Sequence, residues 1–149
     1  MKLAIDEALM NINRGGGPFG AVIVKGGKMI SSCSNRVTID NDPTAHAEIL
    51  AIREAAETLG TWDLSDCEIY SSCEPCPMCL GAIYWAHIPI VYYGANRDDA
   101  REAGFDDSEI YEELKKDLMI RKVRMRIVFR DRAIQVFQKW KKSSEKKLY

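Results

Sequence analysis

A histidine motif followed by a cysteine motif constrains this chain more than any other feature. "HAE" occupies residues 46–48 and "PCPMC" occupies residues 75–79, so thirty positions separate His46 from Cys76. Cys76 and Cys79 stand three apart at the expected beginning of a helix, where their sulfurs point to one side of the first turn and the helix dipole favours thiolates. The fold must therefore bring the beginnings of two helices together.

Three nitrogen and sulfur ligands with a vacant fourth position are what a catalytic zinc needs, because that position holds the water that the metal acidifies. The order HxE and then PCxxC is also the signature of zinc-dependent nucleobase deaminases. The sequence therefore predicts one Zn²⁺ per chain, bound by His46, Cys76 and Cys79. Glu48 is expected to shuttle a proton from the water to the substrate rather than to bind the metal.

Simpler interpretations of each motif stay open. An isolated histidine is more often a capping or core residue, and an isolated CxxC is a redox pair or half of a structural zinc site. Cys73 is expected to be a buried residue at the end of a strand. In a structural zinc module it would instead close a four-ligand site, which would leave Glu48 without a role and would unfold when zinc is removed.

Length and composition indicate a soluble globular protein. The 149 residues are enough for one domain, 46% of them are apolar, and no apolar run approaches the length that spans a bilayer. The first thirteen residues do not resemble a secretory signal, and five cysteines are an odd number that, in a reducing compartment, indicates metal ligands or redox groups rather than disulfides. We therefore expect a cytoplasmic protein without a membrane partner.

Hydrophobic periodicity predicts strands separated by single helices. We expect helices over residues 1–13, 41–60, 76–86 and 133–142, a loop and a further helix over 95–118, and strands within 21–35 and at 67–73, 90–94 and 122–130. Asp42 or Thr44 is expected to cap the second helix, and Gly26-Gly27 to turn the first hairpin. Crossover helices pack on the sheet they connect, so the expected fold is a three-layer α/β/α domain, residues 1–149, with a mixed five-stranded sheet.

Charge is divided unequally along the chain. Residues 1–114 hold 8 Lys and Arg against 19 Asp and Glu, whereas residues 115–149 hold 13 against 3. Such a division can mark a nucleic-acid-binding tail, or a solvated strand and helix that offset an acidic body. The second interpretation is favoured, since basic runs are common without a nucleic-acid partner. The overall pI near 6.1 is also unsuited to binding RNA.

Three stretches, "GPFGAVIVKGGKMI", "NDPTAHAEILAIREA" and "SCEPCPMCLGAIYWA", resemble the cytidine-deaminase-like superfamily over essentially the whole chain. Residues 102–113, "EAGFDDSEIYEE", and the final "KKLY" are similar to the pattern of bacterial guanine deaminases. The resemblance implies the cytidine deaminase-like fold and hydrolytic deamination of guanine to xanthine and ammonia by a zinc-activated hydroxide, with Glu48 as proton shuttle. It also implies a role in purine catabolism or salvage.

The same resemblance implies which residues contact the purine: Phe19, Asn35, Ala47, Asp107 and Tyr149. In that assignment Phe19 packs against the ring, Asn35 bonds it, Asp107 reads its edge and relays a second proton, and Tyr149 closes the pocket. Without the resemblance, four of these residues would be interpreted more simply: Phe19 as a core aromatic, Asn35 as a turn residue, Asp107 as a helix cap beside Ser108 and Tyr149 as a chain end.

The resemblance further implies a homodimer, either ordinary or with the C-terminal segment, residues about 120–149, exchanged between subunits. The basic segment of one chain would then lie on the acidic body of the other. The chief rival is a tRNA-adenosine deaminase, which shares "PTAHAE" and "PCPMC" and would place the basic segment on phosphates. Deaminases of guanosine or cytosine also remain, and a nucleic-acid partner is not expected.

Overall fold

The computed structural model describes residues 1–148, so Tyr149 lies outside the described part. The chain forms two compact units, Met1–Asp107 and a unit that begins at Ser108, and each is described by itself. The assignment of residues 1–149 to a single domain stays a prediction. Within the described residues, no helix is long and apolar enough to cross a membrane.

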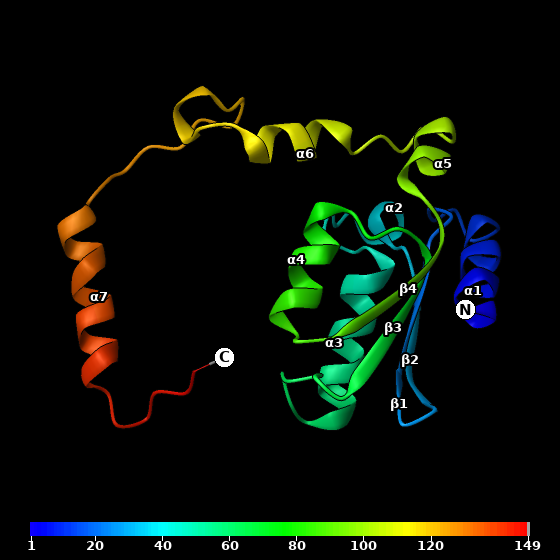
Figure 1. The fold of residues 1–149 in the computed structure, drawn as a ribbon, viewed down its shortest axis with the longest axis horizontal. Coiled ribbons are helices and arrows are strands. Elements are labelled where there is room, and N and C mark those ends of the chain that lie inside the picture. The colour runs from blue at the N-terminus through cyan, green and yellow to red at the C-terminus, as the bar shows by residue number, and fades with distance from the viewer. Residues whose placement is uncertain (149) are drawn as a thin grey trace. The chain divides into compact units, whose positions relative to one another are not determined.

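The first unit is built on one mixed sheet of four strands (Figure 1). The strands are β1 (Gly20–Lys25), β2 (Lys28–Ser34), β3 (Cys67–Cys73) and β4 (Ile90–Ala95), in the spatial order β2-β1-β3-β4. β1 pairs antiparallel with β2 and with β3, whereas β3 and β4 are parallel. The hairpin turns at Gly26 and Gly27, whose φ angles of +54° and +76° suit glycine, as predicted.

Helices cover both faces of this sheet, which confirms the three-layer prediction. α1 (Lys2–Ile12) packs on one face, while α3 (Ala47–Leu59) and α4 (Pro77–Trp85) pack on the other (Figure 1). Two short helices, α2 (Val37–Asp40) and α5 (Arg97–Glu102), lie in the connections after β2 and β4. α4 provides the crossover that parallel β3 and β4 require.

Small residues allow α3 to lie close to the sheet. Ala47, Ala51 and Ala55 have no exposed surface, and they pack against the buried side chains of Ile23 and Ile69. Ser31 on β2 donates its hydroxyl to the carbonyl of Ala51 at 2.8 Å, in the middle of the helix. α3 is thus held at a fixed depth, and so is the site at its beginning.

The beginning of α3 differs from the prediction. His46 is the N-cap, with extended backbone angles, and its carbonyl accepts the first helical hydrogen bond from Leu50. Asp42 instead accepts hydrogen bonds from the backbone and hydroxyl of Thr44, which closes a local turn before the helix. The prediction that Asp42 or Thr44 caps α3 is therefore wrong, and the end at Gly60, in the left-handed region, is confirmed.

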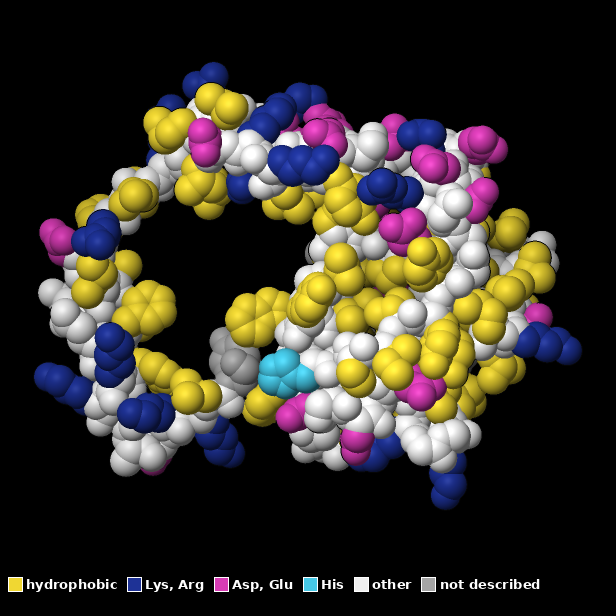
Figure 2. Space-filling model, viewed as in Figure 1, with side chains coloured by type: hydrophobic (Ala, Val, Ile, Leu, Met, Phe, Trp, Pro, Cys, Tyr) yellow, Lys and Arg dark blue, Asp and Glu magenta, His cyan; other side chains and the backbone are white. Residues whose placement is uncertain are grey.

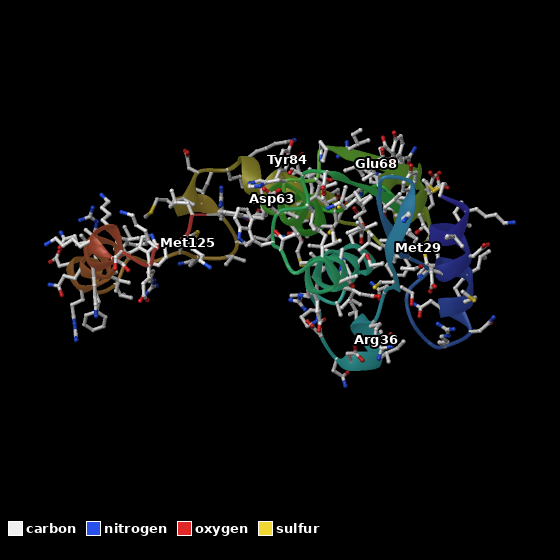
Figure 3. All side chains as sticks on the ribbon, turned by 90° about the horizontal axis from the view of Figure 1, so that it is seen from below. Met29, Arg36, Asp63, Glu68, Tyr84 and Met125 are labelled. Carbon is white, nitrogen blue, oxygen red and sulfur yellow. The ribbon has the colours of Figure 1, made fainter. Side chains whose placement is uncertain are left out.

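The second unit contains α6 (Ser108–Lys115), the 3₁₀ helix η1 (Leu118–Ile120) and α7 (Arg130–Lys142). α7 confirms the helix predicted over 133–142. Many Lys and Arg side chains cover this unit (Figure 2), as expected from its charge. Met125 lies in the extended segment before α7 (Figure 3).

The predicted fifth strand at residues 122–130 is wrong, and the sheet has four strands rather than five. Val123, Met125, Ile127 and Phe129 do fall on alternate positions, but all four side chains are exposed. A strand also requires a hydrogen-bonded neighbour. Among the described residues, the segment is paired with no other strand.

Candidate metal centre and substrate cavity

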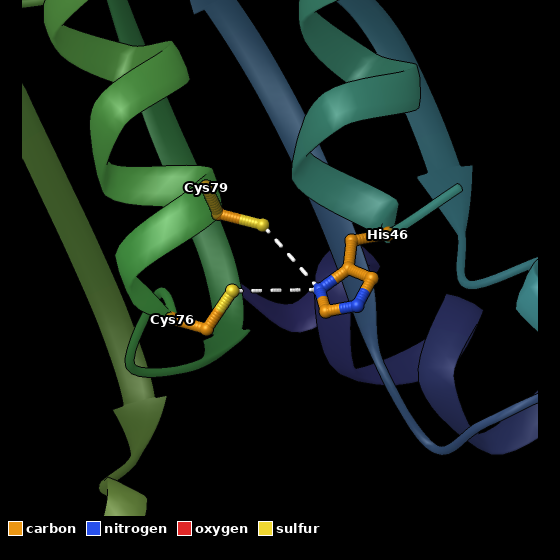
Figure 4. A group of neighbouring side chains, drawn as sticks. All are labelled: His46, Cys76 and Cys79. Atoms are coloured by element: carbon orange, nitrogen blue, oxygen red, sulfur yellow. Dashed lines mark hydrogen bonds between the residues drawn. The ribbon is translucent and has the colours of Figure 1, made fainter. Parts of the chain in front are cut away.

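The three predicted ligands lie together where α3 and α4 begin (Figure 4). His46 is the N-cap of α3, Cys76 is the N-cap of α4, and Cys79 lies in the first turn of α4. His46 Nδ1 is 3.6 Å from Cys76 Sγ and 3.5 Å from Cys79 Sγ, and the ligand atoms all lie within 4.8 Å of one another. Each side chain projects from a helix end toward the same point.

These distances fit a tetrahedral zinc site. Zinc–nitrogen and zinc–sulfur bonds of about 2.0 and 2.3 Å, at the tetrahedral angle, place nitrogen and sulfur about 3.5 Å apart. Hydrogen bonding, first from Cys79 and then from His46, lowers the pKa of the Cys76 thiol to about 4, whereas the neighbouring Cys76 raises that of Cys79. The group therefore fits one Zn²⁺ per chain, with one ligand position left for water.

Cys73 lies at the end of β3 and is buried, as expected. Its Sγ is 3.6 Å from the carbonyl oxygen of Asn96, and the next residue, Glu74, donates its backbone N–H to the carbonyl of Ala95 at 2.8 Å. Among the described residues, the only group of metal-binding side chains consists of His46, Cys76 and Cys79. A three-ligand set is typical of a catalytic zinc site rather than a structural one.

Glu48 lies in the first turn of α3 and is almost completely buried. Ser71 Oγ donates to its Oε1 at 3.1 Å, and its Oε2 is 3.5 Å from Cys79 Sγ. Burial raises the pKa of the Glu48 carboxyl. A carboxylate with a raised proton affinity beside the metal group suits the proton-shuttle role that the sequence predicts.

A cavity of about 580 Å³ opens beside the metal group, within the size range of small-molecule sites. Its lining comes from the loop before β1, the ends of β2 and β3, the beginnings of α3 and α4, and residues 97–107. Four of the predicted site residues besides the metal ligands line it: Phe19, Asn35, Glu48 and Asp107.

Ala47, which the resemblance assigns to the purine site, is not among the residues that line this cavity. Its side chain has no exposed surface and packs in the core beneath α3. Its backbone N–H belongs to the first turn of the helix, whose amides have no acceptor within the helix. Any contact with a substrate would therefore be made by this amide, and the assignment stays a prediction.

Aromatic side chains form one wall of the cavity. Phe19 meets Phe105 edge to face, with ring centroids 4.9 Å apart and planes at 84°. Phe105 was not among the predicted residues, although it stands next to the two aspartates of "GFDDS", which could have indicated it. An aromatic wall can contact the flat face of a heterocycle.

Polar groups complete the lining. Asn35 Oδ1 accepts a hydrogen bond from the Val37 amide at 3.2 Å, which orients the side chain. Burial is the main cause that raises the pKa of the Asp107 carboxyl. Glu74 accepts from the Arg97 backbone at 3.1 Å. Carboxylates, an amide and an aromatic wall together suit a neutral, flat heterocycle with several hydrogen-bonding groups.

Comparison with known proteins adds the decisive observation. The model of the cytidine and deoxycytidylate deaminase zinc-binding region matches residues 1–95, which contain His46, Cys76 and Cys79. The chain belongs to this deaminase family.

Individual relatives of this deaminase differ in how much of it they match. The guanine deaminase of Bacillus subtilis is 51% identical over 150 residues, covering 100% of this chain and 96% of the relative. Its crystal structure superposes with a TM-score of 0.96 at 52% identity, over 99% of this chain and 95% of that one. A guanine deaminase from Nitrosomonas europaea gives a TM-score of 0.68 at 36% identity, over 71% of this chain and 62% of that one.

A tRNA-specific adenosine deaminase of Aquifex aeolicus is 45% identical to this deaminase over 95 residues, 64% of this chain and 63% of the relative. The similarity to the Bacillus subtilis guanine deaminase therefore extends well beyond the portion that the tRNA deaminase shares. That portion is about as long as the region matched by the family model.

Proposed function

We propose that this deaminase converts guanine and water to xanthine and ammonia. The observation that carries the proposal is the extent of the similarity: the guanine deaminase matches the whole chain at 51% identity, whereas the tRNA-specific adenosine deaminases match 64 to 85% of it at 36 to 46% identity. The cavity agrees with a purine base as substrate, since an aromatic wall and a few polar groups lie beside the metal group.

His46, Cys76 and Cys79 would hold a zinc ion, which would supply a water of lowered pKa as the nucleophile for the ring carbon that carries the amine. Glu48 receives the proton that the water gives up and passes it to the neighbouring ring nitrogen. Glu48 next moves the remaining proton to the amine, because ammonia leaves far more readily than an amide ion. Its burial beside the metal group supports this role.

The substrate contacts form part of the same proposal. Phe19 packs against the purine, and Asn35 hydrogen-bonds it from the end of β2. Asp107, at the cavity wall, reads the guanine edge and relays a second proton. Ala47 contributes its backbone amide. Tyr149 closes the pocket in this proposal, although it lies outside the described residues.

The substrate assignment is tested by incubating the purified, zinc-loaded protein with guanine, guanosine, cytosine, adenine and an anticodon stem-loop. Released ammonia and the products are measured together. We expect xanthine from guanine. Deamination of the stem-loop alone would overturn the proposal in favour of a tRNA-adenosine deaminase.

We further propose a homodimer in which residues about 120–149 cover the partner subunit. β4 is an edge strand of the first unit, and the side chains of Ile90, Tyr92 and Tyr93 are exposed on it. An edge strand with exposed apolar side chains tends to pair with a strand of another chain or to be covered by another segment. The second unit exposes Val123 and Ile127 and carries most of the positive charge (Figure 2). Association would bury both apolar surfaces and bring opposite charges together.

Sedimentation equilibrium tests the dimer. We expect a mass twice the 16.9 kDa of one chain. Ile127→Asp should weaken association, whereas Met29→Asp, a change at an exposed apolar residue of the β1–β2 hairpin, should not. A fully active monomer would contradict the proposal.

We also propose a cytoplasmic location. All five cysteines are free thiols, which is typical of proteins in a reducing compartment.

A further inference from the structure

Asn11 is a fully buried amide near the end of α1, in a helix whose other buried residues are alanines. Its Nδ2 donates two hydrogen bonds, to the carbonyl of Gly17 at 2.8 Å and to the carbonyl of Asn35 at 2.6 Å. Its Oδ1 is buried without a hydrogen-bond partner in the structure. The side chain thus joins two segments that are far apart in the sequence.

The unpaired Oδ1 indicates that the two hydrogen bonds donated by Nδ2 account for an amide at this position. A buried acceptor without a partner costs free energy, and an apolar residue of similar volume would avoid that cost. Turning the amide over would not help, because Oδ1 would then face two carbonyl oxygens. The arrangement is therefore accounted for by what the NH₂ group holds in place.

The group belongs to a closed ring of hydrogen bonds. The Phe19 amide donates to the same Gly17 carbonyl at 2.8 Å, and the Asn35 amide donates to the Phe19 carbonyl at 3.0 Å. Asn11 closes the ring by donating to Gly17 and to Asn35. Three members of the ring, Gly17, Phe19 and Asn35, line the cavity, whereas Asn11 does not.

Glycine is required where this loop passes Asn11. A Cβ on Gly16 would lie 2.2 Å from Asn11 Nδ2, and a Cβ on Gly17 would lie 3.1 Å from Asn35 Oδ1. At Gly16 the loop and the Asn11 amide are therefore in contact with no space for a further atom, and at Gly17 the fit against Asn35 is tight. A displacement of the Asn11 side chain would therefore also displace the loop that carries Phe19.

We propose that Asn11 is a positioning residue for the purine site, which sets the distance and orientation between the Phe19 ring and the Asn35 amide. The inference rests on the proposed function, because these two side chains are the proposed base contacts. Asn11 acts through the backbone of both residues and touches neither the substrate nor the metal group. Its loss should therefore weaken binding of the base more than it slows the chemistry.

The test uses Asn11→Leu, which keeps the volume and removes both donors, and Asn11→Asp, which keeps the shape and places a carboxylate against the two carbonyls. For each zinc-loaded variant we measure kcat, KM for guanine, the dissociation constant of 8-azaguanine, zinc content and Tm. We expect KM and the dissociation constant to rise about ten-fold or more, with kcat changed less than about three-fold and one zinc per chain retained.

Leu64→Ala is the matched control, because Leu64 is equally buried but lines no part of the cavity. It should lower Tm with KM unchanged. An unchanged KM in the Asn11 variants, or a KM rise that Leu64→Ala reproduces, would overturn the proposal. If neither Asn11 variant folds, Gly16→Ala carries the same test, since its Cβ must displace the amide. A wild-type protein that leaves guanine unchanged would refute the proposed function instead.

Discussion

Ser71 Oγ lies 3.1 Å from Glu48 Oε1, and both side chains are buried. Ser71 is on β3, the strand that leads to the Cys76 helix, whereas Glu48 is on α3. The hydrogen bond therefore links the strand to the helix that carries the proposed proton shuttle, and it restricts the rotation of the carboxylate.

Replacing Ser71 tests this relationship. A hydrogen bond to a charged group contributes about 1.5–3 kcal/mol, so Ser71→Ala should lower kcat by about ten-fold or more while zinc content stays at one per chain. Ser71→Thr keeps the hydroxyl and should retain most of the activity. Equal kcat values in wild type and Ser71→Ala would show that the bond does not assist turnover.

Glu48→Ala should retain zinc and lose turnover. The carboxylate is proposed to carry protons and not to bind the metal, and general acid–base groups contribute about 10² to 10⁴ in rate. Zinc is measured by elemental analysis and turnover by ammonia release. Glu48→Gln, which keeps the volume, is the control for packing. Loss of the metal in both variants would mean that Glu48 had been misassigned.

The cysteines should divide into two classes. Cys76→Ser and Cys79→Ser should each reduce zinc affinity strongly, because each removes one of the three thiolate or imidazole ligands. Cys73→Ser is the matched control and should keep one zinc per chain. Elemental analysis after gel filtration provides the measurement, and zinc loss in Cys73→Ser would instead support a four-ligand site.

Chelation separates catalytic from structural zinc. We expect the metal-free protein to be inactive yet folded at 25 °C by circular dichroism, since the sheet and its helices enclose a core of their own. Activity should return when Zn²⁺ is added. Unfolding on removal of zinc would favour the structural zinc module.

Phe105→Ala should raise KM for guanine. Removing this ring deprives Phe19 of an edge-to-face partner, and such pairs contribute about 0.5–1.5 kcal/mol, so a rise of about two- to ten-fold is expected. Steady-state kinetics measures it. Met29→Ala, a change at an exposed side chain of the hairpin (Figure 3), is the control and should leave KM unchanged.

Removal of Tyr149 should impair catalysis without unfolding the protein, if this residue closes the pocket as the guanine deaminase resemblance implies. The truncated chain is compared with the full chain in kcat/KM and in Tm. Tyr149→Phe keeps the ring and separates the hydroxyl from the aromatic contact. Unchanged kinetics after truncation would exclude Tyr149 from the site.

Local interactions explain what the sequence by itself determined. Three correct predictions depend only on residues that are neighbours in the sequence. They are the pairing of Cys76 with Cys79 within one helical turn, the hairpin turn at Gly26 and Gly27, and the helix α7. The metal group could be predicted because His46, Cys76 and Cys79 are chemically distinctive and lie at helix beginnings.

Tertiary structure decided the features that depend on distant partners. Residues 122–130 have the strand period, yet a strand exists only where a neighbour supplies hydrogen bonds, and no period encodes that neighbour. The ring from Asn11 to Asn35 and the contact of Phe19 with Phe105 join segments separated by 24 and 86 positions. Asn11 and Phe105 belong to no recognisable motif in the sequence. Only tertiary packing places Phe105 in the wall of the cavity and Asn11 behind it.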